Sequence, residues 1–212
     1  MVAARAVSPA SSLARANCCW KTGSSPARAI SGRSSASIAS LAAAAAHDVR
    51  RVVFTSSFAA VGYSPRPADW TFDEADWTDP ADPNSPYVLS KTLAERAAWD
   101  FADAHPDGPE LTVINPVGVF GPALGSGLST SVGIIALLLS GRPDPLPRAS
   151  FSVVDVRDVA DLHIRALAHP AAAGQRYLAV AGAPMTLPEI AATLRDRLGA
   201  AAARVPVEDA TD

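Results

Sequence analysis

The sequence of 212 residues lacks several features that would define a class of protein at once. Its cysteines, Cys18 and Cys19, are adjacent, so it has neither a disulfide framework nor the ligand spacing of a metal site. No apolar run reaches the roughly 18 residues that a membrane-spanning helix needs. A net charge of -3 gives no electrostatic reason to expect nucleic acid or an anionic membrane as a partner. We therefore expect a globular, cytoplasmic protein without a metal centre.

Acidic residues are also missing from the first forty positions, where serine, alanine and arginine dominate. Such a composition resembles an organelle transit peptide, and it equally resembles translation from a wrong frame or a wrong start. No hydrophobic period persists there for more than a few residues. We therefore expect residues 1–40 to be a non-native, disordered or targeting-like leader, and residues 41–212 to form the folded domain.

From residue 41 onward, segments with strand character alternate with segments of helical character. Apolar runs at 50–57, 111–122 and 175–182 predict buried strands, and the second of these should break at Asn115–Pro116. Thr186 and Glu189 form a capping box for a later helix. The alternation predicts an α/β fold with a parallel sheet.

The helix predicted after Pro86 carries a tyrosine and a lysine on the stripe that it should bury. Its apolar stripe, which ends at Phe101, runs back through Lys91 and Tyr87, one turn apart. An ammonium about 4 Å from a phenol stabilises the phenolate by about 4 kcal/mol at an effective dielectric constant of 20. Such a tyrosine could exchange protons near neutral pH. A snorkelling lysine beside a core tyrosine is the simpler alternative.

Four motifs, in this order, resemble one family. They are "VVFTSS", "SPYVLSKTLAERAAWDFA", "NPVGVFGP" and "FSVVDVRDVADLHIRAL". Together they resemble the extended short-chain dehydrogenase/reductases of the NAD-dependent epimerase/dehydratase superfamily, and most closely the dihydroflavonol 4-reductase branch. The resemblance implies a Rossmann-like parallel sheet with a small C-terminal substrate lobe over about residues 121–212. It also implies hydride transfer between a nicotinamide cofactor, NAD(P), and a ketone or alcohol. Of the two cofactors, NADP is slightly preferred.

The resemblance assigns a role to each matching residue. Ser57 would hydrogen-bond the substrate carbonyl, Tyr87 would carry the proton, and Lys91 would assist Tyr87 and bind the nicotinamide ribose. The turn of Asn115, Pro116, Val117 and Gly118 would meet the nicotinamide end of the cofactor. Phe58, which follows Ser57, would shape the substrate pocket. The expected partner is a small carbonyl or alcohol compound, and a homodimer is compatible with the resemblance.

The sequence departs from this family at its start. The first strand and its glycine-rich turn are missing, because "GVFGPALGSG" follows a later strand and has the wrong spacing. We therefore expect a partial Rossmann-like sheet that lacks its first strands, with the strand at 50–57 as an uncovered edge. The C-terminus also stops early within the expected lobe. Both features predict weak dinucleotide binding and impaired catalysis.

Other interpretations of the sequence stay open or are less favoured. A nucleotide-sugar epimerase or dehydratase would share the same Ser, Tyr and Lys, and a non-catalytic remnant or interaction module would keep the signature without the cofactor site. His163 is expected to be a core histidine, since a hydrolase would need a nucleophile elbow that is absent. The acidic residues of the loop before Tyr87 are expected to form a solvated rim, with Trp70, Phe72 and Trp77 as its anchors.

Overall fold

The computed structural model describes residues 26–125, 127 and 129–207 of the chain. Helices and strands alternate through the described part, as the sequence predicts. The helices are α1 (Pro26–Ala46), α2 (Pro86–Ala104), α3 (Thr130–Leu139), α4 (Val156–Ala168) and α5 (Leu187–Leu198). The strands are β1 (Arg51–Thr55), β2 (Glu110–Pro116), β3 (Gly118–Phe120), β4 (Ser150–Asp155), β5 (Arg176–Ala179) and β6 (Ala181–Thr186).

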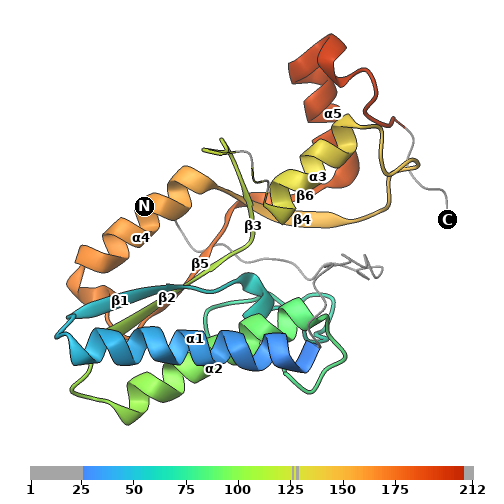
Figure 1. Cartoon of the computed structure of the whole chain (residues 1–212). Helices are drawn as coiled ribbons and strands as arrows, with labels where there is room; N and C mark the ends of the chain where they lie inside the picture. Colours follow the sequence, from blue (N-terminus) through green and yellow to red (C-terminus); the bar gives the residue numbers. More distant parts are fainter. Residues whose placement is uncertain (1–25, 126, 128, 208–212) are drawn as a thin grey trace.

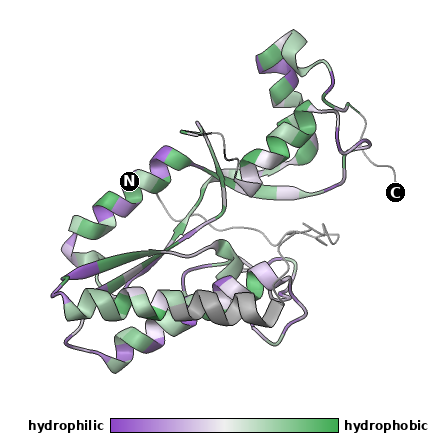
Figure 2. Ribbon diagram, in the orientation of Figure 1, coloured by the Kyte–Doolittle hydropathy of each residue, from purple (hydrophilic) through white to green (hydrophobic). Residues whose placement is uncertain are grey.

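The first sheet is parallel, in the order β1-β2-β5, which confirms the predicted α/β architecture. Helices α1 and α2 cover one face of this sheet and α4 covers the other (Figure 1). Hydrophobic residues follow one another along β1 and β2, as expected for strands covered on both faces (Figure 2). Leu111 and Val113 face the first pair of helices, whereas Ile114 packs with Val159 of α4.

Strand β1 lies at the edge of this sheet, since it pairs with β2 alone among the described residues. The prediction of an edge strand at 50–57 is therefore confirmed. Helix α1, in contrast, begins at Pro26, so of the expected non-native, disordered or targeting-like leader, the alternative of disorder is wrong for 26–40. Alanine has the highest helix propensity, which favours a helix although the segment has no periodic stripe of apolar residues. Leu41 also packs beside Ala98 of α2, and this tertiary contact stabilises the helix further. The remaining leader, 1–25, lies outside the described residues.

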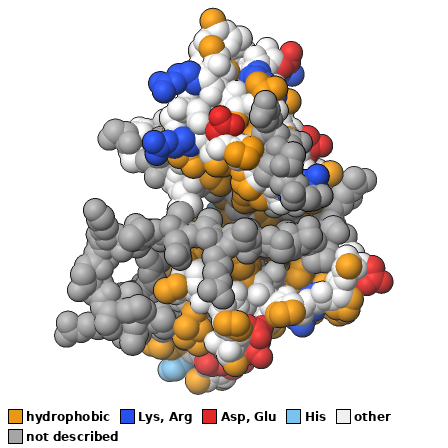
Figure 3. Space-filling view, turned by 90° about the vertical axis from the view of Figure 1, so that its right-hand side faces the viewer, with side chains coloured by type: hydrophobic (Ala, Val, Ile, Leu, Met, Phe, Trp, Pro, Cys, Tyr) orange, Lys and Arg blue, Asp and Glu red, His pale blue; other side chains and the backbone are white. Residues whose placement is uncertain are grey.

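A second three-stranded sheet forms part of the lobe at the top of Figure 1. Its order is β3-β4-β6, with a parallel first pair and an antiparallel second pair. Helices α3 and α5 close the lobe around a core that includes Leu138, Leu146 and Ile190. On the face shown in Figure 3, side chains of both charge signs are scattered over this lobe among hydrophobic ones.

The strand predicted at 175–182 is divided between the two sheets. Residues 176–179 are β5 of the first sheet, and β6 of the second sheet begins at Ala181. Leu178, Ala179 and Val180 are all buried, so the apolar run continues through the crossing and gives no sign of it. Within the described ranges, every helix is too short or too polar to span a lipid bilayer.

Candidate active site

The candidate site lies where parallel strands of the first sheet end. Ser56 and Ser57 follow β1, and Asn115 and Pro116 end β2 beside them, because parallel strands present their carboxyl ends at one edge. Helix α2 begins at the same edge. Its N-cap is Ser85, whose Oγ accepts a hydrogen bond from the N–H of Val88, and Pro86 occupies the first turn.

The structure brings Ser57 and Tyr87 together. The Tyr87 hydroxyl lies 3.4 Å from Ser57 Oγ and is oriented to donate to it, a long contact for an O–H···O hydrogen bond. Ser57 also caps the short 3-10 helix Phe58–Ala60, because its Oγ accepts from the N–H of Ala59 at 3.1 Å. Tyr87 is 54% exposed, so the two hydroxyls face an accessible surface rather than the buried side of α2.

Lys91, half-buried and one turn after Tyr87, points toward the sheet. Its ammonium donates hydrogen bonds to the backbone carbonyls of Thr55 at 3.3 Å and Ser56 at 3.2 Å. Lys91 therefore points inward, as its place on the stripe of α2 predicts, and its ammonium is hydrogen-bonded to the carbonyls at the end of β1. A tyrosine, a serine and a lysine from two segments thus meet at one strand end, which is the constellation that the sequence motifs predict.

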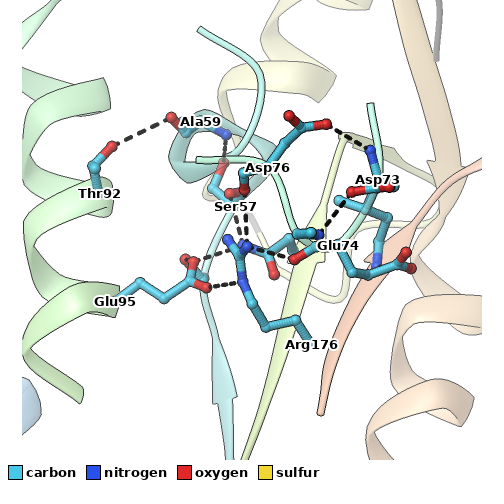
Figure 4. A network of polar contacts seen from close by, with 12 residues as sticks. Ser57, Ala59, Asp73, Glu74, Asp76, Thr92, Glu95 and Arg176 are labelled. Atoms are coloured by element: carbon cyan, nitrogen blue, oxygen red, sulfur yellow. Dashed lines mark hydrogen bonds and ion pairs between the residues drawn. The ribbon is translucent and has the colours of Figure 1, made fainter. Parts of the chain in front are cut away.

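Behind these residues lies a buried network that the sequence analysis did not find (Figure 4). Glu95, with no exposed surface, accepts hydrogen bonds from Ser56 Oγ at 2.5 Å and from Asn115 Nδ2 at 2.6 Å. Its other carboxylate oxygen accepts from Arg176 Nε at 2.7 Å. The spacing of Tyr87, Lys91 and Glu95, four residues each, was a signal that could have identified Glu95.

Arg176 connects this network to the long loop between β1 and α2. Its guanidinium donates to the carbonyls of Glu74 at 2.7 Å and Asp76 at 2.9 Å, and it stacks on Trp77 at 3.8 Å from the ring centroid. The Glu74 carboxylate accepts from the N–H of Leu178. The expectation of a solvated acidic rim is therefore wrong for Glu74 and Asp76, which turn inward and hold the loop on the sheet. Trp77 anchors the loop as expected.

The predicted cofactor-binding turn is largely engaged within the protein. The Asn115 side chain is fully buried and donates to Glu95 and to the Ser57 carbonyl, 3.1 Å away, while Pro116 is buried as the last residue of β2. The Val117 N–H donates to the Ala179 carbonyl, and Gly118 pairs with Val153. Val117 and Gly118 keep partial exposure, so these two could contact a ligand at this edge.

Aromatic side chains line the loop beside Ser57. Phe58 is half-buried and packs edge-on against Phe72, with ring centroids 5.5 Å apart, and against Tyr63 at 6.3 Å. Burial raises the pKa of Tyr63, and the nearby Tyr87 adds to this increase. Phe58 thus packs with other aromatic residues of the loop, next to Ser57 in the sequence.

His163 is half-buried, whereas a core histidine was expected. Its Nδ1 contacts the carbonyl of Val159 in its own helix and its Nε2 lies 2.7 Å from Thr55 Oγ1, so the ring joins α4 to the end of β1.

A dinucleotide fits one end of this site. The exposed Tyr87 hydroxyl and the inward Lys91 ammonium suit a nicotinamide ribose, a neutral polar group that accepts and donates hydrogen bonds. For the pyrophosphate, the described residues offer no glycine-rich strand-to-helix turn beside β1, whose outer edge is unpaired. The structure thus brings together the residues that were expected to carry the proton, and the described part of the chain lacks the expected pyrophosphate turn.

The parallel sheet with this cluster at its carboxyl edge defines a Rossmann-like α/β protein. The sequence model of the NAD dependent epimerase/dehydratase family matches residues 12–181, and the chain belongs to this family.

Two curated relatives and one solved structure show how close the likeness is. Over 135 residues, 61% of this chain and 40% of the relative, it is 44% identical to cinnamoyl-CoA reductase CAD2 of Medicago truncatula. Over 180 residues, 77% of this chain and 52% of the relative, it is 36% identical to the NADPH-dependent methylglyoxal reductase GRE2 of Saccharomyces cerevisiae. The structure of yeast Gre2 complexed with NADPH matches 75% of this chain and 51% of that chain, with a TM-score of 0.66 and 33% identity. The chain therefore spans about half the length of these relatives.

Proposed function

We propose that this chain carries the proton-transfer site of an NADPH-dependent carbonyl reductase, acting on an aldehyde or ketone or, in reverse, on an alcohol. The observation that carries the proposal is the meeting of Ser57, Tyr87 and Lys91 at one strand end. The sequence relatives support the same class, since both are named as reductases and one as NADPH-dependent.

Each side chain has a distinct task in this proposal. A carbonyl oxygen held between the hydroxyls of Ser57 and Tyr87 would accept a hydrogen bond from each, which fixes its orientation. Tyr87 would then deliver its proton to that oxygen as negative charge develops on it. The Lys91 ammonium, held by two carbonyls, would stabilise the resulting phenolate through its positive charge. NADPH, when bound, supplies the hydride for the carbonyl carbon.

The substrate surface would be apolar on one side. Phe58 with its aromatic neighbours would contact the substrate next to the carbonyl, while the exposed side of Tyr87 would leave an opening for entry. This arrangement suits a small carbonyl compound with an apolar substituent.

Two alternative functions are less well supported. A nucleotide-sugar epimerase or dehydratase would use the same three residues, but the relatives matched at 36% and 44% identity are named as reductases. A non-catalytic interaction module would not need an accessible tyrosine beside Ser57, yet Tyr87 is half-exposed there.

The proposal is tested by NADPH oxidation in the presence of aldehydes and ketones, with Tyr87→Phe compared with Tyr177→Phe. Tyr177 lies on β5, half-buried against the core cluster that includes Ile114, and serves as the matched control. We expect Tyr87→Phe to lose at least about a hundredfold in rate, the usual contribution of general acid catalysis, and Tyr177→Phe to lose little. If the chain alone shows no turnover, the same variants are compared after the N-terminal segment of a reductase relative is joined to it. Turnover that survives Tyr87→Phe would remove Tyr87 from the mechanism.

Weak cofactor binding by the 212-residue chain is a separate part of the proposal. Titration with NADPH, followed by the fluorescence of the nicotinamide, should show no saturable binding below millimolar concentration. Saturation at micromolar concentration would contradict this part and leave the assignment of Ser57, Tyr87 and Lys91 intact.

A further inference from the structure

Glu95 is a buried carboxylate that the proposed reaction does not use. It has no exposed surface, and both of its oxygens are occupied: one by Ser56 Oγ and Asn115 Nδ2, the other by Arg176 Nε. A buried charge is costly unless it is paired and hydrogen-bonded, so this carboxylate holds its partners in a narrow range of positions.

Two of these partners lead directly to the candidate site. Ser56 supplies the carbonyl on which Lys91 rests, at 3.2 Å, and its own side chain donates to Glu95. Asn115 uses the same amide nitrogen to donate to Glu95 and, at 3.1 Å, to the Ser57 carbonyl. The carboxylate therefore holds Ser56 directly and Ser57 through Asn115. These two residues form the turn after β1 that accepts a hydrogen bond from Lys91.

The geometry points to Glu95 as a positioning residue for the Ser57–Tyr87–Lys91 cluster, an inference that rests on the proposed function for its catalytic meaning. Glu95 accepts hydrogen bonds from Ser56 and Asn115, and it acts on the cluster through these two residues. Loss of its carboxylate should release the Ser56–Ser57 turn, and the Lys91 ammonium should then lose part of its support at the strand end.

The chain allows this to be measured without cofactor or substrate. Lys21 and Lys91 are the only two lysines of the sequence, so the rates at which an amine-reactive reagent labels them can be separated by mass spectrometry. The ratio of the Lys91 rate to the Lys21 rate, at one fixed pH, reports how firmly Lys91 is held. We expect Glu95→Gln and Ser56→Ala each to raise this ratio about fivefold, equivalent to about 1 kcal/mol at 25 °C.

Two further variants separate positioning from general loosening. Glu110→Gln removes the carboxylate that pairs with Arg51 at 2.6 Å, at the opposite end of β1, and should leave the ratio unchanged. Ser56→Thr keeps a hydroxyl next to Glu95 and should restore the ratio toward that of the unaltered chain. Circular dichroism and urea unfolding establish which variants are folded.

The outcomes decide the inference. A raised ratio in Glu95→Gln and Ser56→Ala, with Glu110→Gln unchanged and Ser56→Thr restored, supports it. An unchanged ratio in folded Ser56→Ala overturns it, as does an equal rise in Glu110→Gln. Should Glu95→Gln fail to fold, Ser56→Ala decides alone. Since no turnover is measured, failure of the reductase assignment would leave this result readable by itself.

Discussion

Removal of the Arg176 guanidinium should be among the most destabilising single changes in the described part of the chain. In Arg176→Met, Glu95 would remain fully buried with its charge uncompensated, because the pair is 9% and 0% exposed. Breaking a buried ion pair from one side costs about 3–5 kcal/mol. Methionine retains much of the apolar volume, so most of this cost is electrostatic.

The exposed pair of Asp161 and Arg165 is the matched control. Its side chains are 53% and 73% exposed, and such a pair contributes at most about 1 kcal/mol. Arg165→Met should therefore change stability little. Urea unfolding followed by circular dichroism measures both variants, and at a slope of about 2 kcal/mol per molar the Arg176→Met midpoint should fall by about 2 M.

A double variant distinguishes an uncompensated charge from lost packing. Replacing both partners, as Glu95→Leu with Arg176→Met, should recover part of the lost stability, since no charge then stays buried. The reasoning is refuted if Arg176→Met lowers the free energy of unfolding no more than Arg165→Met does. It is also refuted if the double variant is clearly less stable than Arg176→Met, because removing the second charge would then restore nothing.

Three further predictions follow from local geometry. A Cβ added at Gly62 would lie 2.2 Å from the Phe58 ring, so Gly62→Ala should cost about 1–3 kcal/mol in urea unfolding, whereas Gly133→Ala, with open space on α3, should stabilise by about 0.5–1 kcal/mol. Thr186→Ala should cost about 1 kcal/mol in the same assay, because it removes the hydroxyl of the capping box of α5. Hydrogen bonds from Arg157 lower the pKa of Asp155 from 3.8 to about 2, so this carboxylate contributes stability above pH 3.8 that is lost as the pH falls toward 2. Unfolding measured across that range should be less pH-dependent in Asp155→Asn, which can still cap α4; an unchanged pH profile would contradict the assigned interaction.

Local sequence signals predicted much of the fold because the structures they specify are local. The capping box of Thr186 and Glu189 is present, and β2 ends at Pro116 as the Asn115–Pro116 break indicates. The parallel sheet followed from the alternation of apolar strands and helices. Ser57 and Tyr87 could be brought together from sequence because one follows a strand and the other opens the next helix, and both positions lie at the same sheet edge.

The second sheet and the buried network depend on distant pairings, and the four-residue spacing of Tyr87, Lys91 and Glu95 was the one local signal of the network. Val180 separates β5 from β6 inside one apolar run, and only pairing of β6 with β4 reveals that the chain has changed sheets. Glu95 pairs with an arginine 81 positions later, so the local sequence of α2 does not show which residue compensates its charge. Asn115 was expected at the cofactor end of the turn, but its side-chain amide is buried and donates to the Ser57 carbonyl and to Glu95.

Helix α2 carries its three important polar side chains at intervals of four residues, and their environments change steadily along it. Tyr87 is half-exposed, Lys91 half-buried, and Glu95 without exposed surface. The exposed end can therefore meet a ligand, while the buried end is fixed by hydrogen bonds to β2, to β5 and to the residue that follows β1. One residue inserted between Tyr87 and Lys91 would turn the two by about 100° relative to each other. The position of Tyr87 thus depends on the same helical register that buries Glu95. A residue two turns away from Tyr87 therefore contributes to the geometry of the site.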